Sequence, residues 1–461
     1  MRNKDIALLT LTITIVAFAV VLQFMTQTAQ ESLEAIQSSL EVPEPVRHFV
    51  ALVSGEAGTS GKFDSTTVPA AVNPDALCGP PLSTMQQWVT LFEEAGLWTN
   101  ADDISLDGWS GQAAPDGGSI LHSLTQDESR NLETFLERVR ALAPCGGPLY
   151  PIALTAECLE QQPHWNSLTD VASLLFYDAR HAKEQEDTAR AVANLIAAMQ
   201  VADALALEPL FDAQTVRFTV YRLALHCYME LLGDTVLPHE LSAPLSAHLA
   251  QAHHAEGLHT GISGELIMTG HYFASFRVEG YRDSINKFGI LVATNRQLWR
   301  SPFFRPYFLE DERSALEFLQ RIAAIPISPY YKIKPDLKQI LKDVDALPIT
   351  RDHIKHIVPS IARSGFLGQA CHEIAVDLWR LRLLVQRFES ETGALPRNLE
   401  EAASRFGEGL PIDPSIGKPY GYQSDGDCYR LRSGLPALII QSGQLRASAD
   451  DLESMSQICP R

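Results

Sequence analysis

The sequence of 461 residues is poor in basic side chains, with 37 Lys and Arg against 56 Asp and Glu and a formal net charge of −19. Binding to nucleic acid needs a surplus of Lys and Arg to neutralise phosphates, so we expect no nucleic-acid partner. Hydrophobic residues make up 46% of the chain and charged residues 20%. These values exclude a disordered or collagen-like chain, and the length leaves room for two or three domains with cores of their own.

The motifs of several enzyme classes are also missing. No P-loop and no G-x-G-x-x-G stands between a strand and a helix, and Gly261-Ile262-Ser263-Gly264 lacks the spacing of a nucleophile elbow. The 7 cysteines do not form the paired C-x-x-C pattern of a zinc site. We therefore predict no catalytic activity and no cofactor, and expect an interaction or structural role.

One long uncharged run, from Ile6 to Met25, is the most informative segment. A helix needs about 20 apolar residues to cross a bilayer core, and the run has that length. Basic residues precede the run and acidic residues follow it, which favours a cytoplasmic N-terminus. The sequence thus predicts a tail at 1–5, a transmembrane anchor at 6–25 in the inner membrane, and a periplasmic remainder. The alternative is a cleaved signal peptide, although Gln27-Thr28-Ala29 is a poor cleavage site.

The cysteines fit an exported protein. Cys227 and Cys371 lie within helical patterns and are predicted to be buried thiols. The others fall into two groups, for each of which we hypothesise one disulfide: loop cysteines (Cys78, Cys145 and Cys158) and C-terminal cysteines (Cys428 and Cys459).

Hydrophobic periodicity predicts a mainly α-helical fold. A stalk and loop-rich helical region covers 26–165, an irregular antiparallel helical array covers 166–368, and a long helix with a small C-terminal α/β module covers 369–461. The Ala-rich segment carries one apolar stripe (Val192, Leu195, Ile196, Met199 and Ala202). Helices are expected near 84–97, 126–143, 168–185, 210–232, 239–255, 262–278, 308–324, 335–345, 369–391 and 398–406.

Local signals define the C-terminal module. Gly393 is expected to end the long helix, and Asn398-x-x-Glu401 has the pattern of an N-cap. Two aromatic-bearing runs, KPYGYQ and CYRLRS, flank the turn sequence SDGD and predict a β-hairpin.

The segment from 384 to 432 resembles a C-terminal module of large membrane-anchored proteins from Planctomycetes-type bacteria. Its order of helix, T-G-x-x-P, short helix, P-x-D-P-x-x-G-K-P and Tyr-rich hairpin is also similar to the C-terminal end of the major pseudopilin of type II secretion systems. Upstream, GELIMTGHYF and RPYFLEDERSALEFL extend the likeness to about 165–435. The positions that carry it are Thr392, Gly393, Pro396, Leu399, Pro411, Asp413, Pro414, Gly417, Pro419, Tyr420 and Tyr422.

The resemblance implies no assigned activity, but it does imply a role in an envelope assembly, possible partners among envelope proteins, and a link to type II secretion. Pseudopilins can bind calcium in this area. The resemblance therefore makes Asp413, Asp425 and Asp427 candidate oxygen ligands.

A histidine cluster offers a second candidate metal site. On a continuous helix, His248, Glu256 and His259 would fall within about 80° of one another and could hold zinc, which would make the chain a metal-dependent hydrolase. Against this, the order is not H-E-x-x-H, and Gly257 is expected to break the helix before His259. The alternative is a solvated helix end.

Three smaller features also bear on possible sites. The pairs His353/His356 and His372/Glu373 lack a third ligand and are predicted to be surface or hydrogen-bonded polar residues. The aromatic and basic stretch from Arg296 to Phe308 is either a docking surface or a segment that packs its rings onto the helical core.

Overall fold

In a computed structural model of the chain, the described residues are 126–145, 163–206, 208–232, 235–252, 255–279, 305–347, 352–425, 428–434 and 457–458, with 23, 27, 30–31, 87–88 and 90–91. The predicted membrane anchor lies outside these residues except for Gln23, and so does most of the region 26–165. Within the part of the chain that the structure describes, no helix combines the length and the apolar character needed to cross a membrane.

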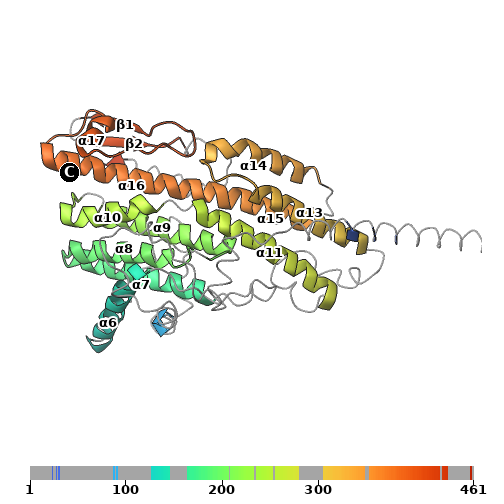
Figure 1. Ribbon diagram of the computed structural model, residues 1–461. Helices are drawn as coiled ribbons and strands as arrows, with labels where there is room; N and C mark the ends of the chain where they lie inside the picture. The colour runs from blue at the N-terminus through green and yellow to red at the C-terminus, as the bar shows by residue number, and fades with distance from the viewer. Residues whose placement is uncertain are drawn as a thin grey trace, which may run out of the picture.

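The described residues form 11 α-helices and a small antiparallel sheet near the C-terminus, so the predicted mainly α-helical class is confirmed (Figure 1). The helices are α6 (Gln126–Leu142), α7 (Pro163–Glu184), α8 (Thr188–Asp203), α9 (Phe211–Leu232), α10 (His239–Gln251), α11 (Ala255–Glu279), α13 (Arg305–Ala323), α14 (Tyr330–Asp345), α15 (Asp352–Ser360), α16 (Phe366–Thr392) and α17 (Leu399–Phe406). A 3₁₀ turn η3 (Ala143–Cys145) follows α6, and a π-helical turn η7 (Ile361–Gly365) joins α15 to α16.

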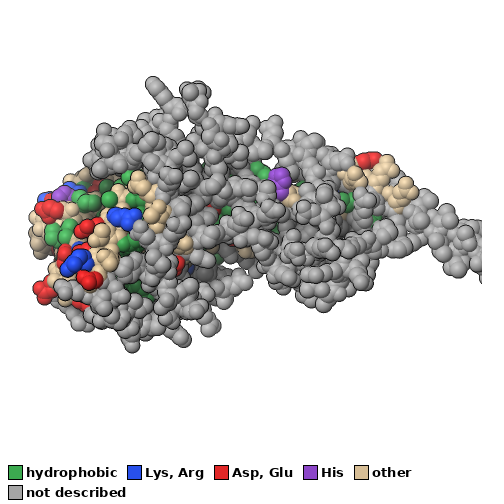
Figure 2. Space-filling view, turned by 90° about the horizontal axis from the view of Figure 1, so that it is seen from below, with side chains coloured by type: hydrophobic (Ala, Val, Ile, Leu, Met, Phe, Trp, Pro, Cys, Tyr) green, Lys and Arg blue, Asp and Glu red, His purple; other side chains and the backbone are tan. Residues whose placement is uncertain are grey.

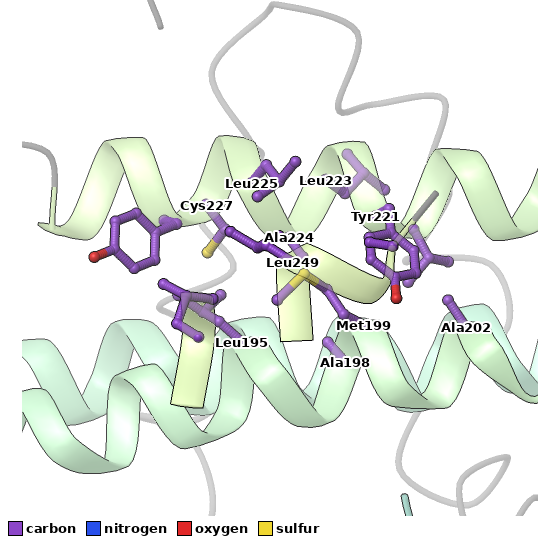
Figure 3. Close-up of a cluster of buried hydrophobic side chains, with 14 of the residues drawn as sticks. Leu195, Ala198, Met199, Ala202, Tyr221, Leu223, Ala224, Leu225, Cys227 and Leu249 are labelled. Carbon is purple, nitrogen blue, oxygen red and sulfur yellow. The ribbon is translucent and has the colours of Figure 1, made fainter. Parts of the chain in front are cut away.

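The first hydrophobic core lies between α6, α7, α8, α9, α10 and most of α16. Small side chains on α8, among them Ala198 and Ala202, alternate with larger ones such as Leu195 and Met199, and all four are buried. Figure 3 shows these side chains facing α9, where Ala224 and Cys227 point back toward α8. The predicted apolar stripe is thus confirmed, with Ile196 half-buried at its edge.

A buried ion network ties three helices of this core together. The carboxylate of Asp178 on α7 accepts hydrogen bonds from Arg190 Nε and Nη2 at 2.9 and 2.6 Å, and from Asn194 Nδ2 at 2.6 Å. Arg140 on α6 lies 3.3 Å from the same carboxylate and donates to Asn194 Oδ1 at 2.7 Å. At this end of the molecule, acidic and basic side chains are intermixed on the surface (Figure 2).

The second hydrophobic core is built by α11, α13, α14, α15 and the first turns of α9 and α16. Its side chains are mostly large, such as Leu258, Leu319, Ile340 and Phe366. Because α16 is 27 residues long, it begins at the second core and continues through the first, and Figure 1 shows it running beside both.

The C-terminal module packs on the far end of α16. Gly393 ends α16 with a left-handed conformation at φ 73°, and Asn398 caps α17 by accepting a hydrogen bond from Glu401 N at 2.8 Å. Strands β1 (Gly421–Asp425) and β2 (Cys428–Arg432) form the expected hairpin, and β3 (Gln457–Ile458) pairs with β2. Both predicted helix signals and the hairpin are confirmed.

The cysteine predictions have mixed outcomes. Cys227 and Cys371 are buried thiols, as predicted. Cys145 is disulfide-bonded, and its partner lies outside the described residues. Cys428 lies on β2, and Cys459 lies outside the described residues, so the hypothesised second disulfide stays a prediction.

Candidate functional site

A set of polar side chains from several helices surrounds Asp203, the last residue of α8. Arg217 on α9 donates to Asp203 Oδ1 from Nε at 3.1 Å and from Nη2 at 2.7 Å. Tyr221, one turn further along α9, donates its hydroxyl proton to Asp203 Oδ2 at 2.7 Å. Arg217 and Tyr221 reach the same carboxylate because residues four apart share a helix face.

His248, in the last turn of α10, approaches the same group. Its Nε2 lies 3.0 Å from the Tyr221 hydroxyl and 3.7 Å from Asp203 Oδ2. Since the single hydroxyl proton of Tyr221 is committed to Asp203, the tyrosine oxygen acts as the acceptor toward His248. His248 therefore carries its proton on Nε2 in this arrangement.

His372 adds the fourth helix, α16. Its ring packs edge-on against Tyr221 at 5.0 Å between centroids and stacks on Phe218 at 5.2 Å. Its Nε2 lies 2.8 Å from the carbonyl oxygen of Ala252, the residue that follows α10. The Asp203 network, defined here as Asp203, Arg217, Tyr221, His248 and His372, thus joins α8, α9, α10 and α16.

Burial sets the protonation states in this network. Burial raises the pKa of Tyr221 well above its usual value, and the neighbouring Asp203 carboxylate raises it further. Burial lowers the pKa of His248 from 6.5, with the Arg217 guanidinium adding to this, and the attraction to Asp203 only partly opposes it. At neutral pH, Tyr221 is a phenol and His248 is a neutral imidazole.

The protonation states and hydrogen bonds of the Asp203 network are suited to holding helices together. The Asp203 carboxylate receives donors on both oxygens, and because the pKa of Tyr221 is raised, the proton in their hydrogen bond stays on the phenol. The nitrogen of His248 that faces the network carries a proton and is not available to a metal ion. Buried polar groups that satisfy one another in this way fix the relative placement of packed helices.

The predicted zinc ligands His248, Glu256 and His259 are not brought together. Among the described residues, no group of three or more His, Cys, Asp or Glu side chains is placed to hold a metal ion. The prediction required one continuous helix, but α10 ends at Gln251 and α11 begins at Ala255. Glu256 is exposed, and His259 is half-buried and hydrogen-bonded to the backbone of Ile325 after α13.

Gly257 was expected to break the helix, and this is wrong, since it lies inside α11. The reason is a close helix approach. A Cβ at Gly257 would lie 2.6 Å from Gln214 Oε1, one at Gly261 would lie 2.9 Å from Leu210 O, and one at Gly264 would lie 1.6 Å from Pro209 O. The three glycines form a side-chain-free face that lets α11 pack directly on the start of α9.

Glu265, next to this glycine face, was not singled out from the sequence. Burial, together with the smaller effect of the Asp212 carboxylate on α9, raises the pKa of Glu265 to about 7. Asp212 is itself shifted upward in pKa by burial. The spacing of Gly257, Gly261 and Gly264 is the sequence signal that could have indicated a closely packed helix face. The carboxyl of Glu265 lies beside that face and would then have been expected to be partly enclosed.

Among the predicted calcium ligands, Asp413 lies fully buried in the loop between α17 and β1. Its Oδ1 accepts hydrogen bonds from Ser415 N and Oγ at 2.8 and 2.6 Å, and its Oδ2 accepts from Ser433 Oγ and Gly434 N at 2.7 and 2.8 Å. These bonds close the loop onto the end of β2. The side chain of Asp425 and all of Asp427 lie outside the described residues, so this calcium site stays a prediction.

The remaining candidates are accounted for by the helices. His372 lies inside α16, is buried and is hydrogen-bonded, as described above. His353 and His356 lie on α15, but their side chains are outside the described part of the structure. Of the stretch from Arg296 to Phe308, only 305–308 is described, and it opens α13, so the choice between docking and packing stays open.

Comparison with protein-family models, with curated proteins and with solved structures found no match for this chain in any of the three. The functional conclusion therefore depends on the residues themselves.

Proposed function

We propose that this chain is a single-pass membrane protein whose helical region, exposed on the periplasmic side, serves as a scaffold for protein partners in the cell envelope. The Asp203 network supports the scaffold part of the proposal, because its side chains bind one another across four helices and hold these helices together. The uncharged run from Ile6 to Met25 and its flanking charges support the anchor.

The C-terminal module supports a link to an envelope assembly. The chain order of α16, α17, the Pro-rich loop and the hairpin is the order that the resemblance to the type II secretion pseudopilin implies. A component related to type II secretion is therefore the second candidate function, and it would use the same membrane anchor as the scaffold.

The anchor is tested with the full chain carrying a C-terminal tag. We expect it to stay with membranes after carbonate extraction, and expect A17R/V20R, which places two charges in the run, to abolish this. The control is a matched substitution outside the run, A255R on α11, which should leave the extraction unchanged. Release of the parent protein, or a mature N-terminus downstream of Ala29, would instead establish a cleaved signal peptide.

The scaffold role is tested by crosslinking intact cells and purifying the tagged chain. We expect a reproducible set of envelope proteins, with secretion components among them under the second candidate. Metal analysis of the same purified chain separates the hydrolase alternative: stoichiometric zinc that is lost in both H248Q and E256Q would favour an enzyme over a scaffold.

A further inference from the structure

Exposed isoleucines lie on two segments that contact one another through Tyr331 and Pro414. Among the described residues, four large hydrophobic side chains are exposed, and three of them are Ile327 at 53%, Ile412 at 51% and Ile416 at 39%. Ile327 lies in the turn before α14, whereas Ile412 and Ile416 lie in the loop that Asp413 closes. All three are partly exposed, and the side chain of Ile416 lies against Gly434, where a Cβ would be 2.5 Å from Ile416 Cγ2.

Tyr331, in the first turn of α14, joins these two segments. Its backbone N donates to the carbonyl of Pro414 at 2.9 Å. A Cβ built at Gly417, where φ is +68°, would lie 2.6 Å from Cζ of Tyr331, so the ring lies directly on the loop backbone. Ile412 and Ile416 are therefore held in a fixed place beside the start of α14.

Lysines surround Tyr331. The Lys332 ammonium lies 5.8 Å from the centre of the Tyr331 ring, and Lys418 follows the glycine on which that ring packs. Lys332, Lys334 and Lys418 are all exposed. The nearby acid on α14, Asp336, lies about 140° around the helix from Tyr331 but only about 40° from Lys332 at 100° per residue, so it offsets part of the charge of Lys332, and Lys334 and Lys418 carry most of the basic character.

We propose that this isoleucine–lysine patch (Ile327, Ile412, Ile416, Lys332, Lys334 and Lys418) rests on a bilayer surface that contains anionic lipids. The inference depends on the proposed membrane anchor, which holds the patch near the bilayer. The exposed isoleucines enter the headgroup region, and the lysines beside them contact lipid phosphates. With a net charge of −19, the chain as a whole is repelled by anionic lipids. The local group of lysines therefore determines which face of the protein contacts the bilayer.

The test uses the full chain in proteoliposomes of equal parts phosphatidylcholine and phosphatidylglycerol. A photoreactive benzoylphenylalanine replaces Ile412 in one variant and Ile327 in another, and lipid adducts are measured by mass spectrometry after illumination. The control places the same group at Val236, which is exposed at 46% between α9 and α10 and lies beside one described lysine contact, that of Lys183 Nζ with Thr235 Oγ1 at 3.3 Å. We expect lipid adducts at 412 and 327 and not at 236.

Charge dependence makes the test specific. Replacing Lys332, Lys334 and Lys418 by Gln is expected to lower the adduct yield about tenfold or more, as is the use of phosphatidylcholine alone. Adducts to protein, equal yields at Val236, or no adducts in a chain that still resists carbonate extraction would each overturn the patch and leave the anchor standing. A chain that does not enter the membrane would overturn the anchor itself.

Discussion

The two hydrophobic cores of this protein are built in different ways. In the first, α8 contributes small side chains such as Ala191, Ala198 and Ala202, and two buried polar networks cross the core. In the second, most of the interior consists of large aliphatic and aromatic side chains, such as Leu316, Leu319 and Ile322 on α13. The distance between packed helices depends on the side chains at the contact, so the alanines bring α7, α8 and α9 close together.

Close approach has a consequence for polar groups. Short helix separations allow Asp178 on α7 to reach Arg190 and Asn194 on α8, and allow Asp203 on α8 to reach Arg217 and Tyr221 on α9. Such groups define one register between helices, which a uniformly apolar contact does less well. The relative placement of helices is therefore set by polar contacts in the first core and by the shapes of large side chains in the second.

Replacing Asp178 by Ala is expected to have the largest effect on stability. The change leaves Arg140 and Arg190 beside a mostly buried position without their carboxylate, and breaking a buried ion pair typically costs about 3–5 kcal/mol. Urea denaturation of the full chain in detergent, followed by circular dichroism, measures the loss.

Asp343 provides the matched control, since it pairs with Arg321 at 2.5 Å between α14 and α13, where the two side chains are 35% and 43% exposed. Asp343→Ala should have little effect, because exposed ion pairs contribute little. Equal effects of the two substitutions would contradict the contrast between the cores.

The seam between the cores is tested by Gly264→Ala on α11. The new methyl group would lie 1.6 Å from the carbonyl oxygen of Pro209, which is backbone and cannot rotate away. We expect a loss of about 3 kcal/mol, at the upper end of overpacking effects, despite the better helix propensity of Ala.

Gly270→Ala on the same helix separates packing from propensity. Its methyl group would lie 3.9 Å from Leu316 Cδ2, an ordinary contact. Here the substitution should stabilise the protein by about 0.5–1 kcal/mol. If Gly264→Ala were also neutral or stabilising, α11 would not pack on the start of α9 as closely as the structure shows.

Much of the fold could be predicted because its signals are local. The alternation of apolar residues on α8, the cap at Asn398, the stop at Gly393 and the Asp-Gly turn each depend on neighbours in the sequence. The interpretation of Gly257 failed because its cause is not local: Gln214 occupies the space that a side chain at Gly257 would need.

The candidate site was harder to predict for the same reason. His248 was singled out for its neighbours in the sequence, Glu256 and His259, whereas its partners in the structure are Tyr221 and Asp203 from two other helices. Nothing in the spacing of these residues indicates that they meet. Asp413 was expected as a cation ligand, whereas its burial and hydrogen bonds depend on Ser433 and Gly434, which follow the hairpin.

The Asp203 network predicts a loss of stability in acid. Burial lowers the pKa of His248 below its unfolded value of 6.5, so the unfolded chain binds a proton more readily than the folded one. Stability therefore falls as the pH decreases from about 6.5 through the folded pKa, and the contribution is fully present only above about 6.5. Denaturation midpoints between pH 5 and 8 should show a shallower slope in H248Q than in the parent.

A matched variant shows whether the histidine or the whole network is responsible. Tyr221→Phe removes the hydroxyl but leaves His248 buried, so it should lower stability at every pH and keep the slope. A slope unchanged in H248Q would mean that other groups titrating between pH 5 and 8, His259 and Glu265 among them, dominate the response.

Asn398→Ala should have the smallest effect. Asn398 Oδ1 accepts from Glu401 N at 2.8 Å, and Glu401 Oε2 accepts in turn from Arg397 N at 2.7 Å. Loss of an N-cap typically costs about 1 kcal/mol. Asn398→Asp retains an acceptor and should stay close to the parent in urea denaturation. Leu399 and Ala402 of α17 belong to the first core. If Asn398→Ala lowers the midpoint of a single unfolding transition, the C-terminal module unfolds together with that core. If it lowers the midpoint of a separate transition, the module is a third unit that unfolds independently.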